Sequence, residues 1–176
     1  MSHYISISSL NVQLMNLASL AIAGEDLCRR YMYKSSSSLY DKEFYSKTLK
    51  LSVSESLIEL AVKLRSFDEF CPFEPENNID IYENKINRVP KNLRCLCNKI
   101  IHADDVHLDY QSKVSYNQDF IWWGGQITLS GKQGKKTWVY FFDVVQFCDS
   151  AIDFLHRMQQ LIESKKTKSS DLQQHS

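Results

Sequence analysis

The chain has 176 residues, of which 43% are hydrophobic and 24% are charged, as is ordinary for a soluble globular domain. Its 21 basic and 21 acidic side chains cancel. This balance argues against a nonspecific nucleic-acid coat, which needs a strong positive field, but it is compatible with a local basic cleft. No window is apolar for long enough to span a membrane, so we expect no membrane partner.

The five cysteines are odd in number and irregularly spaced, which is typical of reduced thiols in a cytoplasmic protein. Cys95 and Cys97 lie two residues apart in a stretch with helical periodicity. Residues at that spacing point about 200° away from each other on a helix, so the two thiolates do not share an ion. We therefore predict no metal and no cofactor, and a cytoplasmic location.

The first half of the chain shows helical spacing of its apolar residues. A first helix is predicted from about Leu10 to Tyr31, and a second is clearest from Ser54 to Phe70. The segment 39–51 is compatible with being part of that second helix. Residues 71–78 contain two prolines and an Asn pair, and they predict a long connection.

A third helix is predicted to open at Pro90 and to end near Ala103. A β-hairpin at about 119–142 follows, with Gly124-Gly125 as a bulge and 131–134 as the turn.

The last helix is predicted to begin near Asp143, and it carries a near-heptad apolar stripe. These elements predict a mainly α fold, a four-helix up-and-down bundle with a β-hairpin inserted before the last helix. We assign residues 1–165 to this single domain and 166–176 to a flexible polar tail.

The third helix is the most informative part of the chain. Its apolar residues follow the i, i+3, i+4, i+7, i+8 pattern of a single buried face, at Leu93, Leu96, Cys97, Ile100 and Ile101. On the same helical wheel, Arg94, Asn98 and His102 form a row on the opposite side. We therefore expect this row to face solvent, a partner or a substrate.

The stretch Leu-Arg-Cys-Leu-Cys-Asn-Lys-Ile-Ile-His-Ala that forms this helix resembles the signature of the HEPN superfamily (higher eukaryotes and prokaryotes nucleotide-binding). The resemblance implies a small helical bundle that forms homodimers, and many such proteins are metal-independent ribonucleases of prokaryotic defence or toxin–antitoxin systems. Asn98 matches the polar position of the motif and His102 matches its histidine. The specificity of the likeness rests on about six residues.

One residue departs from the motif. At the spacing Arg-x4-His, the arginine position is occupied by Cys97, and a neutral thiol cannot stabilise the charged transition state of RNA cleavage. Arg94 is a candidate substitute, but it lies two turns before His102 in one helix. Only a two-fold axis near Asn98, with the helices of two copies antiparallel, would bring Arg94 and His102 together.

Other candidate sites have simpler explanations. Residues 131–136 resemble a phosphate loop only faintly, and their lysines are compatible with a solvated turn or a phosphate contact. The tryptophans at 122, 123 and 138 suit base stacking, although anchoring a small hairpin is the simpler use. His107, with its neighbouring Asp104, Asp105 and Asp109, suggests a metal cluster, yet a polar surface loop explains these residues equally well.

These observations leave several function classes open. The first is a catalytically degenerate HEPN-like module that dimerises and binds RNA, a nucleotide or a protein partner. The second is a weak metal-independent endoribonuclease that uses His102, with Asn98 and Arg94 in support. The third is an unrelated helical protein-interaction domain. The absence of the motif arginine favours the first.

Overall fold

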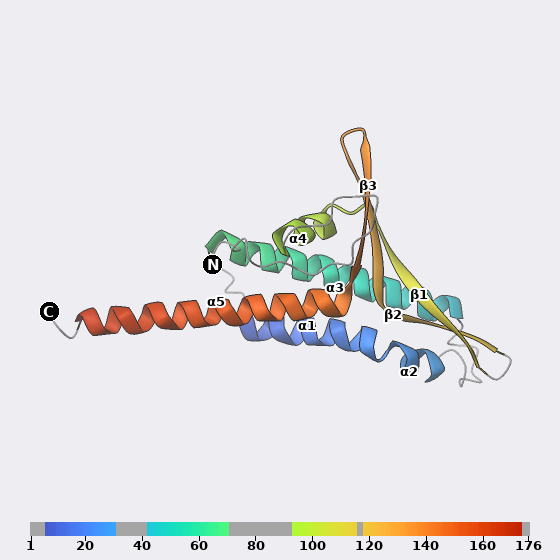
Figure 1. Ribbon diagram of the computed structural model, residues 1–176, viewed down its shortest axis with the longest axis horizontal. Helices are drawn as coiled ribbons and strands as arrows, with labels where there is room; N and C mark the ends of the chain where they lie inside the picture. The colour runs from blue at the N-terminus through green and yellow to red at the C-terminus, as the bar shows by residue number, and fades with distance from the viewer. Residues whose placement is uncertain (1–5, 31–41, 71–92, 116–117, 174–176) are drawn as a thin grey trace.

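The computed structural model describes residues 6–30, 42–70, 93–115 and 118–173. Within these residues the chain forms four helices, then a three-stranded antiparallel sheet, then a fifth helix (Figure 1). The predicted four-helix up-and-down bundle with one inserted hairpin is therefore wrong. The fold contains both helices and a sheet, because a further strand precedes the predicted hairpin and pairs with it. In addition, the first predicted helix is divided in two.

The first two helices replace the single helix predicted from Leu10 to Tyr31. Helix α1 spans Ile7–Ile22, and the side chain of Ser6 caps it by accepting a hydrogen bond from the backbone N–H of Ser9. After Ala23, the short helix α2 spans Gly24–Cys28. The break lets α2 approach the sheet, where the thiol of Cys28 donates to the carbonyl of Ile121 at 2.8 Å.

Helix α3 spans Lys42–Phe70 as one continuous element, so residues 42–51 belong to it. Its buried residues follow a helical period: Leu49, Val53, Leu57, Leu60, Ala61 and Leu64. Helix α1 packs beside it, and a polar contact joins the two helices where Gln13 binds both Glu59 and Lys63. The predicted connection at 71–78 lies outside the described residues.

Helix α4 spans Leu93–Ile101 and packs against α3. Its predicted start at Pro90 lies outside the described residues, and its end falls two residues before the predicted Ala103. The last helix, α5, spans Val144–Gln173 and packs along α1. The carboxylate of Asp143 caps α5 by accepting from the N–H groups of Val145 and Gln146 at 2.8 and 3.1 Å, which agrees with the predicted start.

The apolar stripe of α5 is buried along the body of the protein, at Val144, Cys148, Ala151, Leu155 and Met158. At Ile162 the side chain is already 40% exposed, so the packed part of the helix ends there. Beyond that point α5 projects past the other helices and stays helical to Gln173 (Figure 1). The helix thus includes most of the segment assigned to a flexible tail.

The sheet consists of β1 (Asp105–Ser115), β2 (Gln118–Gln133) and β3 (Lys136–Asp143), with β2 in the centre. Strands β2 and β3 are the predicted hairpin. Strand β1 is not among the predicted elements, and its charged residues were compatible with a metal cluster or with a polar surface loop. Those residues alternate with buried Val106 and Leu108, which is the period of a strand with one face on a core.

A bulge divides the pairing of β1 with β2. Leu108 faces Ile127, but Tyr110 faces Trp123, so β2 carries two extra residues at this point. Gly125 adopts a φ of 102°, which side chains other than glycine rarely tolerate, and the indole N–H of Trp123 donates to the carbonyl of Gln126 at 2.8 Å. The predicted bulge at Gly124-Gly125 is confirmed.

One face of the sheet completes the hydrophobic core. Across the strands, Leu108, Ile127 and Phe142 lie side by side, and all three are buried in the same cluster as the apolar faces of α1, α3, α4 and α5. The opposite face carries the polar side chains of His107 and Thr128 together with Phe141, which is 44% exposed. None of the helices in the described part of the chain is both long enough and apolar enough to cross a membrane.

Candidate functional site

Helix α4 has the buried face that its sequence predicts. Leu93, Leu96, Cys97 and Ile100 are each at most 1% exposed. Ile101 packs at the edge of the same cluster. The apolar period therefore fixes which side of α4 faces the core and which side is available for other contacts.

The three residues of the predicted polar row have different surroundings. Arg94 and His102 are exposed, as predicted, and His102 lies just beyond the end of the helix, where its backbone N–H still donates to the carbonyl of Asn98. Asn98 is only partly exposed. Its side-chain oxygen is buried and has no hydrogen-bond partner among the described residues.

The position that the resemblance assigns to the catalytic arginine lies in the core. Cys97 is fully buried, whereas His102, five residues later, is exposed. Residues five apart on an α-helix point about 140° away from each other. An arginine at position 97 would therefore not share a surface with His102, and a single copy of α4 does not assemble the site that the motif requires.

On its sheet-facing side, α4 carries a cation held by aromatic rings. The ammonium of Lys99 lies 4.4 Å from the centre of the Trp138 ring and 5.2 Å from the centre of the Tyr140 ring. The two rings are tilted against each other with their centres 5.4 Å apart. Cation–π attraction of this kind keeps the ammonium in place while leaving its N–H donors available.

The end of α4 is joined to the hairpin by backbone contacts. The N–H of Asp104 donates to the carbonyl of Ser130 at 2.8 Å. Next to it, Gly131 lies directly under the indole of Trp138, and a Cβ on this glycine would be 2.3 Å from the ring and 3.0 Å from the carbonyl oxygen of His102. Glycine is thus required for the close packing of β2 between α4 and Trp138.

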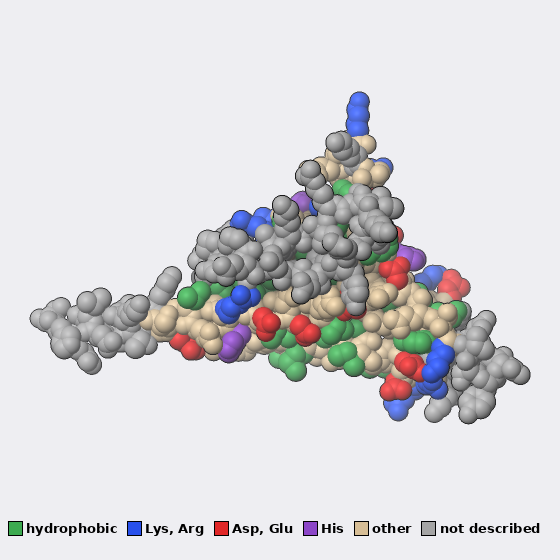
Figure 2. Space-filling model, in the orientation of Figure 1, with side chains coloured by type: hydrophobic (Ala, Val, Ile, Leu, Met, Phe, Trp, Pro, Cys, Tyr) green, Lys and Arg blue, Asp and Glu red, His purple; other side chains and the backbone are tan. Residues whose placement is uncertain are grey.

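This junction gathers positive charge in a protein whose net charge is zero. We name the surface formed by Lys99, Lys132 and Lys135 the basic end; Figure 2 shows blue lysine side chains at the tip of its hairpin. Within the described part of the chain, Lys99, Lys132 and Lys135 form no ion pair with a carboxylate. The acidic residue at this junction is Asp104, which is exposed and whose backbone N–H binds Ser130.

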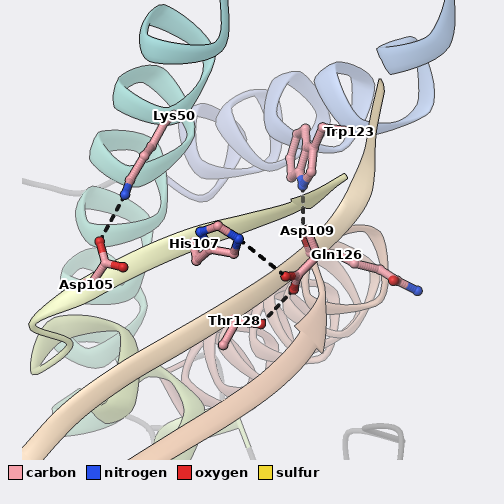
Figure 3. A network of polar contacts seen from close by, with 7 residues as sticks. All are labelled: Lys50, Asp105, His107, Asp109, Trp123, Gln126 and Thr128. Carbon is pink, nitrogen blue, oxygen red and sulfur yellow. Dashed lines mark hydrogen bonds and ion pairs between the residues drawn. The ribbon is translucent and has the colours of Figure 1, made fainter. Parts of the chain in front are cut away.

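A second polar cluster lies on the outer face of the sheet (Figure 3). The hydroxyl of Thr128 donates to the Asp109 carboxylate at 2.7 Å, and His107 Nε2 lies 3.9 Å from the other oxygen of the same carboxylate. Lys50 of α3 reaches Asp105 at 2.9 Å. Its hydrogen bond holds the pKa of Asp105 below the ordinary value of 3.8.

This cluster does not have the features of a metal centre. Among the described residues, no three His, Cys, Asp or Glu side chains are placed to hold an ion. His107 is 64% exposed on the open face of the strand. A strand was not considered for these residues, which fitted a metal cluster or a surface loop, although their alternation with Val106 and Leu108 is visible in the sequence.

Trp123 and Trp138 anchor the sheet in the core, which is the simpler of the two uses predicted for the tryptophans. Trp123 is 1% exposed and Trp138 is 8% exposed, so neither offers an open face for stacking. Trp122 is partly buried. Neither of these two positions therefore provides a ring platform for nucleotide bases.

The chain was also compared with known protein families, proteins and structures. No protein-family model, no curated protein and no solved structure matches the chain.

Proposed function

We propose that the protein is a nucleic-acid-binding module without catalytic activity, and that its basic end contacts phosphate groups. The observation that carries the proposal is the placement of Lys99 over Trp138 and Tyr140, next to a hairpin that adds two further exposed lysines. Phosphate contacts from lysine and arginine supply most of the sequence-independent affinity for nucleic acid.

The environment of Lys99 suits such a contact. Its stem and ammonium are already ordered by the two rings, so less side-chain entropy is lost when a phosphate binds. The lysines of the hairpin extend the positive charge away from the core. Because the rest of the protein carries balancing acidic groups, the attraction is local, and moderate affinity with a strong dependence on salt is expected.

The absence of catalysis is supported by the position of Cys97. An RNA-cleaving site of the HEPN kind needs a cation beside its histidine, and the side chain at position 97 points into the core instead. In our proposal, the protein shares with that superfamily the polar surface of α4 and a binding role in a prokaryotic cytoplasm. The resemblance does not extend to ribonuclease activity.

Binding is tested with end-labelled single-stranded RNA and duplex DNA by fluorescence anisotropy at about 50 mM salt and above. Lys99→Met keeps the apolar stem and removes the charge. We expect it to weaken binding about three- to tenfold and to lower the slope of log affinity against log salt by about 1. The matched control is Lys113→Met, which changes an exposed lysine near the far end of β1. Equal effects of the two substitutions would contradict the proposal.

Catalysis is tested separately with the same RNA. The wild type and His102→Ala are both expected to leave it intact during long incubation with a metal chelator. Cleavage by the wild type that disappears in His102→Ala would overturn the non-catalytic part of the proposal and restore the endoribonuclease alternative.

A further inference from the structure

The part of the β2–β3 hairpin beyond Gly131 and Trp138 projects from the protein as a two-stranded ribbon. We name residues 132–137 the ribbon tip; it stands clear of the helices in Figure 1. Lys132 is paired with Thr137, and Gln133 is paired with Lys136. Gly134 adopts a φ of 62° in the two-residue turn, which matches the tight turns that favour narrow hairpins.

The ribbon tip is held in a fixed direction by its base. There, Trp138 covers Gly131, Lys99 covers Trp138, and the N–H of Asp104 binds Ser130. A ribbon anchored in this way loses little conformational freedom when it enters a partner.

The side chains of the ribbon tip are polar on both faces. Lys132, Gln133, Lys135 and Thr137 are all exposed, and no described side chain of the ribbon tip is apolar. Protein–protein interfaces have an apolar and aromatic centre. Lysine, glutamine and threonine instead are residues that contact the edges of base pairs and the phosphates around them.

The size of the ribbon tip distinguishes between nucleic-acid grooves. Gly134 lies three residue steps beyond Gly131, and at about 3.4 Å per step the strand extends about 10 Å over this distance. The major groove of B-form DNA is about 8.5 Å deep and about 12 Å wide, and it admits a two-stranded ribbon. The minor groove of DNA, about 6 Å wide, is too narrow for such a ribbon, and side chains cannot read the deep, narrow major groove of double-stranded RNA.

From these observations we infer that the ligand of the basic end is duplex DNA, and that the ribbon tip enters its major groove; this inference rests on the proposed function. Lys132 and Gln133 are consecutive in β2, so their side chains project from opposite faces of the ribbon and meet base edges on its two sides. Lysine donates to guanine O6 and N7, and glutamine pairs with adenine N6 and N7. Lys99, at the base of the ribbon, contacts the phosphates that border the groove.

The test uses two duplexes of the same sequence, one with cytosine and one with glucosylated 5-hydroxymethylcytosine. The glucose fills the major groove and leaves the phosphates and the minor groove unchanged. The protein is expected to bind the glucosylated duplex at least about tenfold more weakly than the unmodified duplex, and the double substitution Lys132→Ala with Gln133→Ala is expected to reduce this difference. Lys113→Ala is the matched control and retains the difference.

The outcomes separate this inference from the proposed function. Equal affinity for the two duplexes, or tighter binding to single-stranded RNA than to the unmodified duplex, overturns insertion in the major groove. If Lys99→Met still weakens binding in that case, phosphate binding by the basic end is retained. Loss of all measurable binding to DNA and RNA at about 50 mM salt overturns both.

Discussion

Gly24 of α2 lies so close to Trp123 of β2 that a Cβ on the glycine would be 1.9 Å from the carbonyl oxygen of the tryptophan. That oxygen belongs to the backbone of a central strand and has no room to move. We therefore predict that Gly24→Ala lowers the free energy of unfolding by at least about 3 kcal/mol, measured by chemical denaturation.

The control for this prediction is Gly134→Asn at the tip of the hairpin. A Cβ there meets no atom within 4 Å, and the left-handed φ of 62° is one that asparagine adopts readily. We expect a change of less than about 1 kcal/mol. Similar losses from the two substitutions would show that α2 does not depend on the close approach to β2.

The same substitution at two nearby cysteines of α4 is expected to have a large effect on stability at one position and a small effect at the other. Cys97 is fully buried and Cys95 is exposed. Cys97→Arg places a charge in the core and is expected to destabilise the protein by about 3 kcal/mol or more, without creating RNA cleavage. Cys95→Arg is expected to change stability by less than about 0.5 kcal/mol. A stable, RNA-cleaving Cys97→Arg protein would contradict the assignment of this position to the core.

The ion pair between Lys50 and Asp105 predicts a dependence of stability on pH. The hydrogen bond from Lys50 lowers the pKa of Asp105 in the folded protein below 3.8, so the pair stabilises the fold above about pH 4. This contribution is lost as the pH falls through the lowered pKa. Because both side chains are about half exposed, we expect less than about 1 kcal/mol.

A double-mutant cycle with Lys50→Met and Asp105→Asn measures this contribution. The coupling between the two residues is expected to be present near neutral pH and to decrease as the pH falls below 3.8 through the lowered pKa of Asp105. A coupling that stays constant over this interval would show that packing of the lysine stem, and not its charge, joins α3 to β1.

Thiol reactivity reports on the same core. Burial raises the pKa of Cys148 to about 12, so its thiol is protonated at neutral pH and is expected to be inert to alkylation in the folded protein. Cys95 is exposed and is expected to be modified first among the described cysteines, as mapped by mass spectrometry of digested peptides. Rapid labelling of Cys148 would contradict its buried position beside α1.

The sequence predicted those features that depend on local periodicity. The buried side of α4, the start of α5 at Asp143 and the bulge at Gly124-Gly125 follow from the spacing of apolar residues, a capping carboxylate and a glycine pair. Each of these signals lies within a few residues and needs no knowledge of the rest of the fold.

The features that were missed depend on contacts between distant segments. Strand β1 is stable because β2 pairs with it and because Val106 and Leu108 enter a core built by helices. Its acidic residues are locally compatible with a loop or a metal cluster, so the strand depends on these distant contacts. The break between α1 and α2 is explained by the approach of Gly24 to Trp123. For the candidate site, no local pattern indicates that the hairpin places Trp138 under Lys99, because the two residues are far apart in the chain.

The packing of α1 along α5 has a consequence for synthesis of the chain. Helix α1 ends at Ile22, whereas α5 begins only at Val144, so the two surfaces that cover each other leave the ribosome far apart in time. The sheet, whose strands follow one another closely, can pair as soon as it emerges. Until α5 follows, the part of the apolar side of α1 that α5 covers is exposed to other chains, and this interval is when a nascent molecule is most prone to aggregate.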